Sequence, residues 1–201
     1  MPVTRYSSAN LPTAAGNLLL VVYRETASVP PGAEPKEHMA LVAGDPAKLA
    51  GERVLCRIHS ECWTGETIGS LKCDCREQLD TAIAAILEAG RGVVVYLRQE
   101  GRGIGLGNKI RAYALQEQGA DTVEANEALG FAPDLRSYDL AAAILRDLGV
   151  KSVELMTNNP DKLSGLEAAG VPVHRVPHWG ESQEHNHDYL EVKRQKLGHK
   201  V

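Results

Sequence analysis

Short apolar runs alternate along the chain with longer segments in which apolar residues recur every three or four positions. The run over residues 53–59 alternates strictly, with Cys56 on one face and Arg57 and His59 on the other. This pattern predicts a strand that turns Cys56 towards the core. Similar runs predict strands over residues 18–24, 39–42, 93–97, 152–156 and 171–176.

Helices are predicted where the apolar spacing lengthens. Asp74 suits an N-cap position, and Glu77 three residues later would complete a capping box ahead of an apolar stripe that ends at Gly90. Strands that alternate with helices indicate an α/β layer architecture. Further helices are predicted over residues 109–118, 138–148 and 189–197, and from Pro160 behind Asn159.

The two ends of the chain are more polar than its middle. Residues 1–16 are punctuated by Pro and Gly, which is typical of an arm. We expect an N-terminal arm over residues 1–10 and a single domain over residues 11–201, whose last part, residues 177–201, is a polar tail and helix. A chain of 201 residues is long enough for one compact domain with a sizeable core.

Composition argues against some classes of partner. The 22 Lys and Arg residues are outnumbered by 26 Asp and Glu residues, and a formal net charge of −4 argues against binding to nucleic-acid polymers, which requires a basic field. The apolar run from Leu18 to Tyr23 is too short for a membrane span or a secretion signal. We therefore expect a cytoplasmic protein with neither a membrane nor a nucleic-acid partner.

All four cysteines lie between residues 56 and 75, and in a reducing compartment such clustering indicates metal or thiol chemistry more than disulfides. Cys62, Cys73 and Cys75 offer three thiolates, a set that leaves the fourth position of a Zn²⁺ ion open, as in catalytic sites. Cys75 lies near a predicted helix N-terminus, whose partial positive charge favours the thiolate.

Three alternatives stay open for these cysteines. All four could hold a structural zinc ion, or they could be inert core thiols. The third alternative is a zinc nucleobase deaminase, because His59-Ser60-Glu61 matches the H-x-E half of that motif. Its P-C-x-x-C half is missing.

Glu100 to Gly107 is a glycine-rich segment between a strand and a helix, a setting in which backbone N–H groups can cradle phosphate. It matches neither the dinucleotide fingerprint nor the P-loop, and a flexible connector is an equal alternative. A bound nucleotide would need separate cations for its phosphates, with Mg²⁺ assisting: Arg57, Arg102, Arg136 and Lys162.

Other polar residues have simple structural explanations. Asp134 could cap a helix and Arg136 could be solvated. Tyr113 shares an apolar stripe with Ile110 and could pack in the core. Solvated side chains are expected for three histidines of the polar tail: His178, His185 and His187.

Read together, six motifs resemble the GTP cyclohydrolase II family. The likeness keeps the same order and runs from Leu11 to His199. It implies a mixed β-sheet with flanking helices and a homodimer. The motifs are Arg57-Ile-His-Ser-Glu-Cys62, Ser70-Leu-Lys-Cys-Asp-Cys75, Arg98-Gln-Glu-Gly-Arg102, Asn108-Lys-Ile-Arg-Ala-Tyr-Ala-Leu-Gln116, Asp121-Thr-Val-Glu-Ala-Asn126 and Thr157-Asn-Asn-Pro160.

The resemblance implies hydrolysis of GTP to formate, pyrophosphate and 2,5-diamino-6-ribosylamino-4(3H)-pyrimidinone 5′-phosphate, the first step of riboflavin biosynthesis. One Zn²⁺ per chain would act at the imidazole ring of guanine, and Mg²⁺ at the triphosphate. Zinc lowers the pKa of a bound water from about 15.7 to about 7, so hydroxide would be available at neutral pH.

The resemblance also assigns roles to residues. Cys62, Cys73 and Cys75 would bind zinc. At the α-phosphate, Asp134 would be the proton acceptor and Arg136 the nucleophile, while Tyr113 would serve the ring chemistry. Contacts with GTP would come from Arg57, Ile58, His59, Ser60, Glu61, Gln78, Glu100, Gly101, Arg102, Thr122, Thr157 and Lys162.

Some family members carry a dihydroxybutanone phosphate synthase domain ahead of this one. About ten residues precede Leu11, so we expect a monofunctional form. A zinc-stabilised nucleotide-binding module without enzymatic activity is the rival hypothesis. For Arg136, an electrostatic role is physically preferred over a covalent one, because the pKa of an arginine is above about 12.

Overall fold

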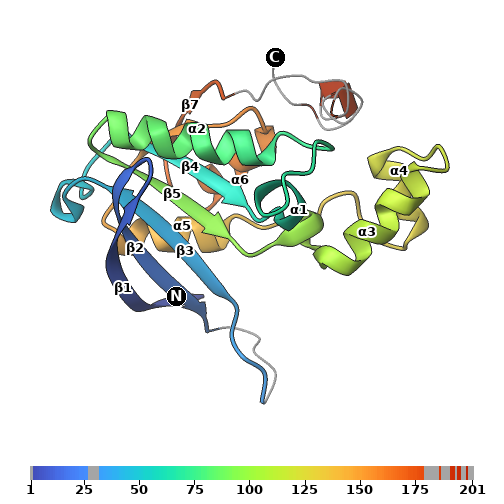
Figure 1. Cartoon of the computed structure of the whole chain (residues 1–201). Coiled ribbons are helices and arrows are strands. Elements are labelled where there is room, and N and C mark those ends of the chain that lie inside the picture. Colours follow the sequence, from blue (N-terminus) through green and yellow to red (C-terminus); the bar gives the residue numbers. More distant parts are fainter. Residues whose placement is uncertain are drawn as a thin grey trace.

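The computed structural model describes residues 2–26, 32–178, 186, 191–192, 194–195 and 198. Within them, the strands form one mixed sheet in the order β1-β2-β3-β5-β4-β6-β7, antiparallel from β1 to β5 and parallel from β5 to β7 (Figure 1). The strands are β1 Val3–Thr13, β2 Gly16–Glu25, β3 Glu37–Ala43, β4 Val54–Ser60, β5 Gly92–Leu97, β6 Val153–Met156 and β7 Val173–Val176.

Helices cover both faces of the sheet, so the predicted α/β fold with a mixed sheet and flanking helices is confirmed. Helix α2 (Cys75–Glu88) packs on one face, while α5 (Asp139–Asp147) and α6 (Pro160–Ala168) pack on the other. The remaining helices lie beyond one end of the sheet (Figure 1): α1 (Trp63–Glu66), α3 (Gly105–Gln116) and α4 (Thr122–Ala128).

The alternation of β4 places its residues as predicted. Cys56 is fully buried in the core beneath α5, and burial raises the pKa of its thiol to about 12. Leu55, on the other face, packs towards α2. Arg57 and His59 therefore share the α2 side of the sheet with Leu55.

The expected N-terminal arm is instead an edge strand, so that prediction is wrong. Residues 3–13 form β1, which pairs antiparallel with β2 from Val3↔Glu25 to Thr13↔Gly16. The side chains from Thr4 to Thr13 are exposed, so no apolar alternation marks the strand in the sequence. Backbone hydrogen bonds, rather than side-chain burial, define it.

Two helix starts differ from the predictions. Asp74 is the N-cap residue of α2, as predicted, but its carboxylate does not make the bond expected of a capping box and accepts instead from Gln78 Nε2 at 2.5 Å. Helix α3 begins at Gly105, within the predicted glycine-rich loop.

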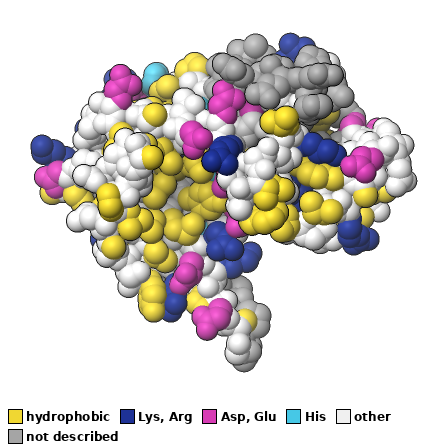
Figure 2. Space-filling model, in the orientation of Figure 1, with side chains coloured by type: hydrophobic (Ala, Val, Ile, Leu, Met, Phe, Trp, Pro, Cys, Tyr) yellow, Lys and Arg dark blue, Asp and Glu magenta, His cyan; other side chains and the backbone are white. Residues whose placement is uncertain are grey.

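The apolar stripe of α3 lies at the surface rather than in the core. Leu106 and Ile110 are 37% and 48% exposed, whereas Lys109 is buried, and Figure 2 shows hydrophobic side chains at the surface over α3. The predicted helix over residues 189–197 falls mostly outside the described residues. No helix in the described part of the chain combines the length and apolar character needed to span a bilayer.

Gly92 provides a test of the packing between α2 and the sheet. A Cβ atom there would lie 2.6 Å from Ile86 Cγ2 and 2.9 Å from the carbonyl oxygen of Leu55. We expect Gly92→Ala to lower the free energy of unfolding by about 1–3 kcal/mol, as overpacking does. Urea denaturation measures the change.

Gly107→Ala is the matched control. A Cβ atom at Gly107 would meet nothing within 4 Å, and the residue lies inside α3. Alanine should therefore leave stability unchanged or raise it by up to about 1 kcal/mol. Equal effects of the two substitutions would contradict the packing described for Gly92.

Candidate active site

The candidate site lies where β4, β5 and β6 end. These strands are parallel neighbours, so their carboxyl ends meet at one edge of the sheet, where open α/β sheets commonly bind ligands. Ser60 is the last residue of β4, Gln99 follows β5, and Thr157 follows β6. The segments after β4 and β5 line a cleft together with α3.

The three predicted zinc ligands come together at this edge. Cys62 precedes α1, Cys75 is the first residue of α2, and Cys73 lies two residues ahead of it. Their sulfur atoms lie within 4.8 Å of one another, and those of Cys62 and Cys73 are 3.6 Å apart. Neither Cys56 nor His59 belongs to this group, so the described residues give no support to a four-cysteine site or a deaminase-like histidine ligand.

The surroundings of the sulfurs fit a divalent metal ion. A Cβ atom at Gly65 would lie 2.9 Å from the Cys73 sulfur and 3.3 Å from the Cys62 sulfur, so glycine keeps this space open. Hydrogen bonding to the Cys62 sulfur raises the pKa of the Cys73 and Cys75 thiols, because ionising them would add negative charge beside it. A cation between the sulfurs would remove that penalty, and three thiolates are a set that Zn²⁺ accepts.

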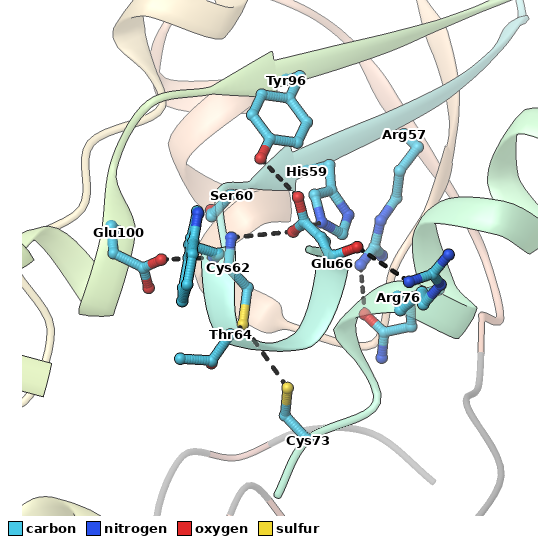
Figure 3. A network of polar contacts seen from close by, with 12 residues as sticks. Arg57, His59, Ser60, Cys62, Thr64, Glu66, Cys73, Arg76, Tyr96 and Glu100 are labelled. Atoms are coloured by element: carbon cyan, nitrogen blue, oxygen red, sulfur yellow. Dashed lines mark hydrogen bonds and ion pairs between the residues drawn. The ribbon is translucent and has the colours of Figure 1, made fainter. Parts of the chain in front are cut away.

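Glu66 organises the segment that carries Cys62 (Figure 3). Its Oε1 accepts a hydrogen bond from the backbone N–H of Cys62 at 2.9 Å and lies 2.8 Å from His59 Nε2. Its Oε2 accepts a hydrogen bond from the hydroxyl of Tyr96. Burial lowers the pKa of His59. The ring of His59, expected at GTP, is thus engaged with Glu66. The role of Glu66 was missed because only the folded chain brings β4 and β5 next to α1.

Glu100 organises the opposite wall of the cleft. Its Oε2 accepts the backbone N–H of Trp63 at 2.6 Å, and its Oε1 accepts that of Gly101 at 2.7 Å and the ammonium of Lys109 at 2.8 Å. Lys109 also donates to the Cys62 sulfur at 3.1 Å. Burial lowers the pKa of Lys109, but Cys62 and Glu100 outweigh it and raise the pKa above its ordinary value.

Tyr113 lies in the cleft rather than in the core. It lines the cleft together with the three cysteines, Glu100 and Arg136. The ammonium groups of Lys72 and Lys109 lie 4.9 Å and 5.8 Å from the centre of its ring. The interpretation of Tyr113 as a core residue beside Ile110 is therefore wrong, because that face of α3 is exposed.

Asp134 and Arg136 form a tight ion pair beside the cleft. Arg136 Nε donates to Asp134 Oδ1 at 2.8 Å, and Arg102 Nη1 donates to Oδ2 at 3.0 Å. Burial raises the pKa of the Asp134 carboxyl, but Arg136 and Arg102 outweigh it and hold the pKa below its usual value. The expectation of a solvated Arg136 is wrong, since only 12% of its side chain is exposed.

Arg102 reaches Asp134 from an unusual backbone conformation. Its φ of 59° lies in the left-handed region, which costs a non-glycine residue about 1–3 kcal/mol. The backbone N–H of Leu135 donates to its carbonyl oxygen at 3.0 Å. This contact and the ion pair with Asp134 hold the turn, and the rest of the glycine-rich segment, from Gly105, belongs to α3.

Several predicted GTP contacts lie behind the cleft, inside the protein. Arg57 Nη1 donates to the Met156 carbonyl at 2.8 Å, its Nη2 donates to Gln78, and burial lowers its pKa to about 10. Lys162 Nζ donates to the Ile58 carbonyl at 2.8 Å. The side chain of Ile58 lies in the core. Thr157 is buried too.

The remaining predicted contacts lie nearer the surface. Ser60, Glu61 and Gly101 line the cleft. The side chain of Ser60 accepts from Gln99 Nε2 at 2.9 Å, and Glu61 pairs with Arg98 at 2.9 Å. The side chain of Thr122 lies outside what the structure describes.

His178 is buried rather than solvated, which corrects another prediction. Its Nε2 lies 2.9 Å from the carbonyl oxygen of Gln78. Asn158 Nδ2 donates to the backbone carbonyl of His178 at 2.7 Å. Burial and then the charge of Arg57 lower its pKa to about 4. His185 and His187 lie outside the described residues.

Fold and site together define an α/β protein whose sheet edge carries a candidate three-thiol metal site beside a cleft lined by cationic side chains. The model of the GTP cyclohydrolase II family matches residues 4–177, and the chain belongs to this family.

The names of similar curated proteins are consistent with this family. The chain is 53% identical over 199 residues to GTP cyclohydrolase-2 of Aeromonas hydrophila subsp. hydrophila, covering 98% of this chain and 96% of that protein. It is 55% identical over 198 residues to riboflavin biosynthesis protein RibBA of Bacillus velezensis, covering 98% of this chain and 48% of that protein. The chain thus spans about half the length of such RibBA relatives.

A solved structure of RibBX, a two-domain 3,4-dihydroxy-2-butanone 4-phosphate synthase from A. baumannii, matches with a TM-score of 0.46 at 24% identity, over 87% of this chain and 40% of that one. A likeness at that level carries no argument about function.

The cysteine geometry predicts which thiols hold metal. Cys73→Ser should lose about one zinc per chain, because it removes one sulfur of the three-sulfur group. Cys56→Ser should keep its zinc, since Cys56 lies in the core. Elemental analysis of the purified variants measures both. Loss of zinc from both variants would point to a four-cysteine structural site instead.

Proposed function

We propose that the chain hydrolyses GTP to formate, pyrophosphate and 2,5-diamino-6-ribosylamino-4(3H)-pyrimidinone 5′-phosphate, the first step of riboflavin biosynthesis. The observation that carries the proposal is a single cleft lined by the three clustered cysteines, Tyr113 and Arg136. One small molecule in this cleft could meet a metal at its base and a cation at its phosphates. Membership of the GTP cyclohydrolase II family supports the same reaction.

The base of GTP would react beside the cysteines. Zn²⁺ held by Cys62, Cys73 and Cys75 would supply a Lewis acid that makes water nucleophilic near neutral pH. We assign the Tyr113 hydroxyl to proton donation at the imidazole nitrogen as the bond to C8 breaks. Glu100 and Gly101 line the same cleft and would orient the ring.

The triphosphate would be handled by the ion-paired group. Arg102 and Arg136 supply fixed guanidinium donors, which suit phosphate oxygens. Both arginines hold the pKa of Asp134 below its usual value, so its carboxylate stays ionised at neutral pH, and the role of proton acceptor comes from the family resemblance. A guanidinium so closely paired with a carboxylate keeps its charge, which favours electrostatic stabilisation of the α-phosphate by Arg136 over covalent attack.

Four further details of the proposal rest on the resemblance to the family. Mg²⁺ would assist at the triphosphate, the protein would be cytoplasmic, and GTP would contact the buried group behind the cleft, including Arg57 and Lys162. The fourth part is a homodimer. Exposed apolar side chains on the segment after Cys62 and on α3 would suit a surface covered by a second copy: Trp63, Ile68, Leu71, Leu106 and Ile110.

The direct test of the function incubates the purified chain with GTP and Mg²⁺ and measures formate and pyrophosphate. We expect both products, and we expect formate to disappear after zinc is removed by a chelator. Binding of GTP without either product would support a zinc-stabilised nucleotide-binding module and overturn the proposal.

Tyr113→Phe tests whether Tyr113 serves formate release but not pyrophosphate release. Removing the hydroxyl should reduce formate release by at least about 100-fold, the lower end of the range for losing a positioned general acid. Pyrophosphate release should continue, and a formamide intermediate should accumulate in mass spectra of the quenched reaction. Tyr6→Phe, on exposed β1, serves as the control. Unchanged formate output in Tyr113→Phe would exclude the proposed proton donation.

Arg136→Lys tests the phosphate chemistry. Lysine keeps the charge but loses the planar fork, so pyrophosphate release should fall about 100-fold, the scale seen when one preorganised donor is lost. Arg111→Lys, exposed on α3, should not change it. Rapid quenching and intact-protein mass spectrometry should show no guanylyl adduct on the wild-type chain. An adduct that vanishes in Arg136→Lys would contradict the electrostatic role.

A further inference from the structure

Lys109 is a buried cation to which the proposed reaction gives no task. Only 11% of its side chain is exposed, although lysines are almost never buried unless they are paired. Helix α3 carries its ammonium to the cleft wall, where it donates to Glu100 Oε1 at 2.8 Å and to the Cys62 sulfur at 3.1 Å. It therefore joins the segment after β4 to the segment after β5.

We propose that Lys109 is a positioning residue of the metal site, whose ammonium fixes the Cys62 sulfur and offsets the negative charge of the thiolates. Three thiolates around a divalent ion leave a net charge of about −1, which is costly in a partly buried site. One ammonium in contact with a sulfur offsets part of that charge, the rest of its own charge being shared with the Glu100 carboxylate. This inference rests on the proposed function in one respect, that the cysteines hold a divalent metal.

The contacts of Glu100 show that Lys109 does more than satisfy a carboxylate. Both oxygens of Glu100 already accept a backbone N–H, from Trp63 at 2.6 Å and from Gly101 at 2.7 Å. Lys109 approaches the sulfur as well as this carboxylate. Groups that hold a metal ligand from outside the coordination sphere typically change metal affinity by about 10- to 100-fold when they are removed.

Lys72 is the matched control. Its ammonium lies on the Tyr113 ring, as that of Lys109 does, at 4.9 Å against 5.8 Å from the ring centre. It pairs with Glu117 at 3.2 Å, and 44% of its side chain is exposed. It adjoins Cys73 in the sequence, so replacing it removes the same charge near the cysteines, whereas the ammonium of Lys72 contacts Glu117 and the Tyr113 ring rather than a sulfur.

The test compares full-length wild type, Lys109→Met, Lys109→Arg and Lys72→Met by competition for Zn²⁺ with a chromophoric chelator, without GTP. We expect Lys109→Met to weaken zinc affinity by about 10- to 100-fold. Lys109→Arg should recover part of that loss, and Lys72→Met should stay within about twofold of wild type because exposed charges are screened. Circular dichroism checks that each variant is folded, and Lys109→Gln replaces Lys109→Met if the latter does not fold.

Cobalt spectra give a readout that a purely structural role would not move. In Co²⁺-loaded Lys109→Met, the thiolate-to-cobalt absorption should shift to longer wavelength, because a sulfur that loses a hydrogen bond gives up charge more readily. Equal zinc affinity in Lys109→Met and wild type, or equal losses in Lys109→Met and Lys72→Met, would overturn the inference.

Failure of this inference is distinguishable from failure of the proposed function. A chain that binds zinc through Lys109-dependent contacts but releases no formate would refute the reaction and leave the role of Lys109 intact. A wild-type chain that binds no zinc would overturn the role of Lys109 and the metal part of the reaction together.

Discussion

The parallel pairing of β4 with β5 is the constraint on which the site depends. Its register continues to Ser60↔Leu97, and the backbone N–H of Glu61 still donates to the Leu97 carbonyl at 2.9 Å. The two chain segments therefore leave the sheet side by side. One carries Cys62 and the other carries Glu100, so the candidate metal ligand and the cleft wall are placed by the same backbone hydrogen bonds.

Buried carboxylates then hold in place the segments that follow the strand ends. Glu66 holds the backbone of Cys62, Glu100 holds that of Trp63, and Asp134 holds two guanidinium groups. Such groups add little to stability, because their desolvation offsets most of the attraction. Their effect is positional: each of these carboxylates accepts hydrogen bonds from two or more groups, which restricts the backbone and the side chains beside the cleft.

Alternation and cysteine spacing were sufficient to predict the strands from β2 to β7, the core position of Cys56 and the grouping of the other three thiols. Two predictions from the sequence were wrong because contacts between distant parts of the chain determine the structure there. The stripe of Leu106 and Ile110 predicted a buried face for α3, but Glu100 and the Cys62 sulfur draw Lys109 inward and turn that stripe outward. Strand β1 has no apolar alternation because its side chains from Thr4 to Thr13 are exposed, and its backbone pairing with β2 leaves no such pattern in the sequence.

The proposed reaction depends on a metal ion held by Cys62, Cys73 and Cys75, with a fourth position open to water or substrate. X-ray absorption spectroscopy of the zinc-loaded chain counts the ligands directly. We expect three sulfur neighbours and one lighter atom, oxygen or nitrogen. A shell of four sulfur atoms would contradict this expectation, because a closed four-thiolate zinc is a structural site.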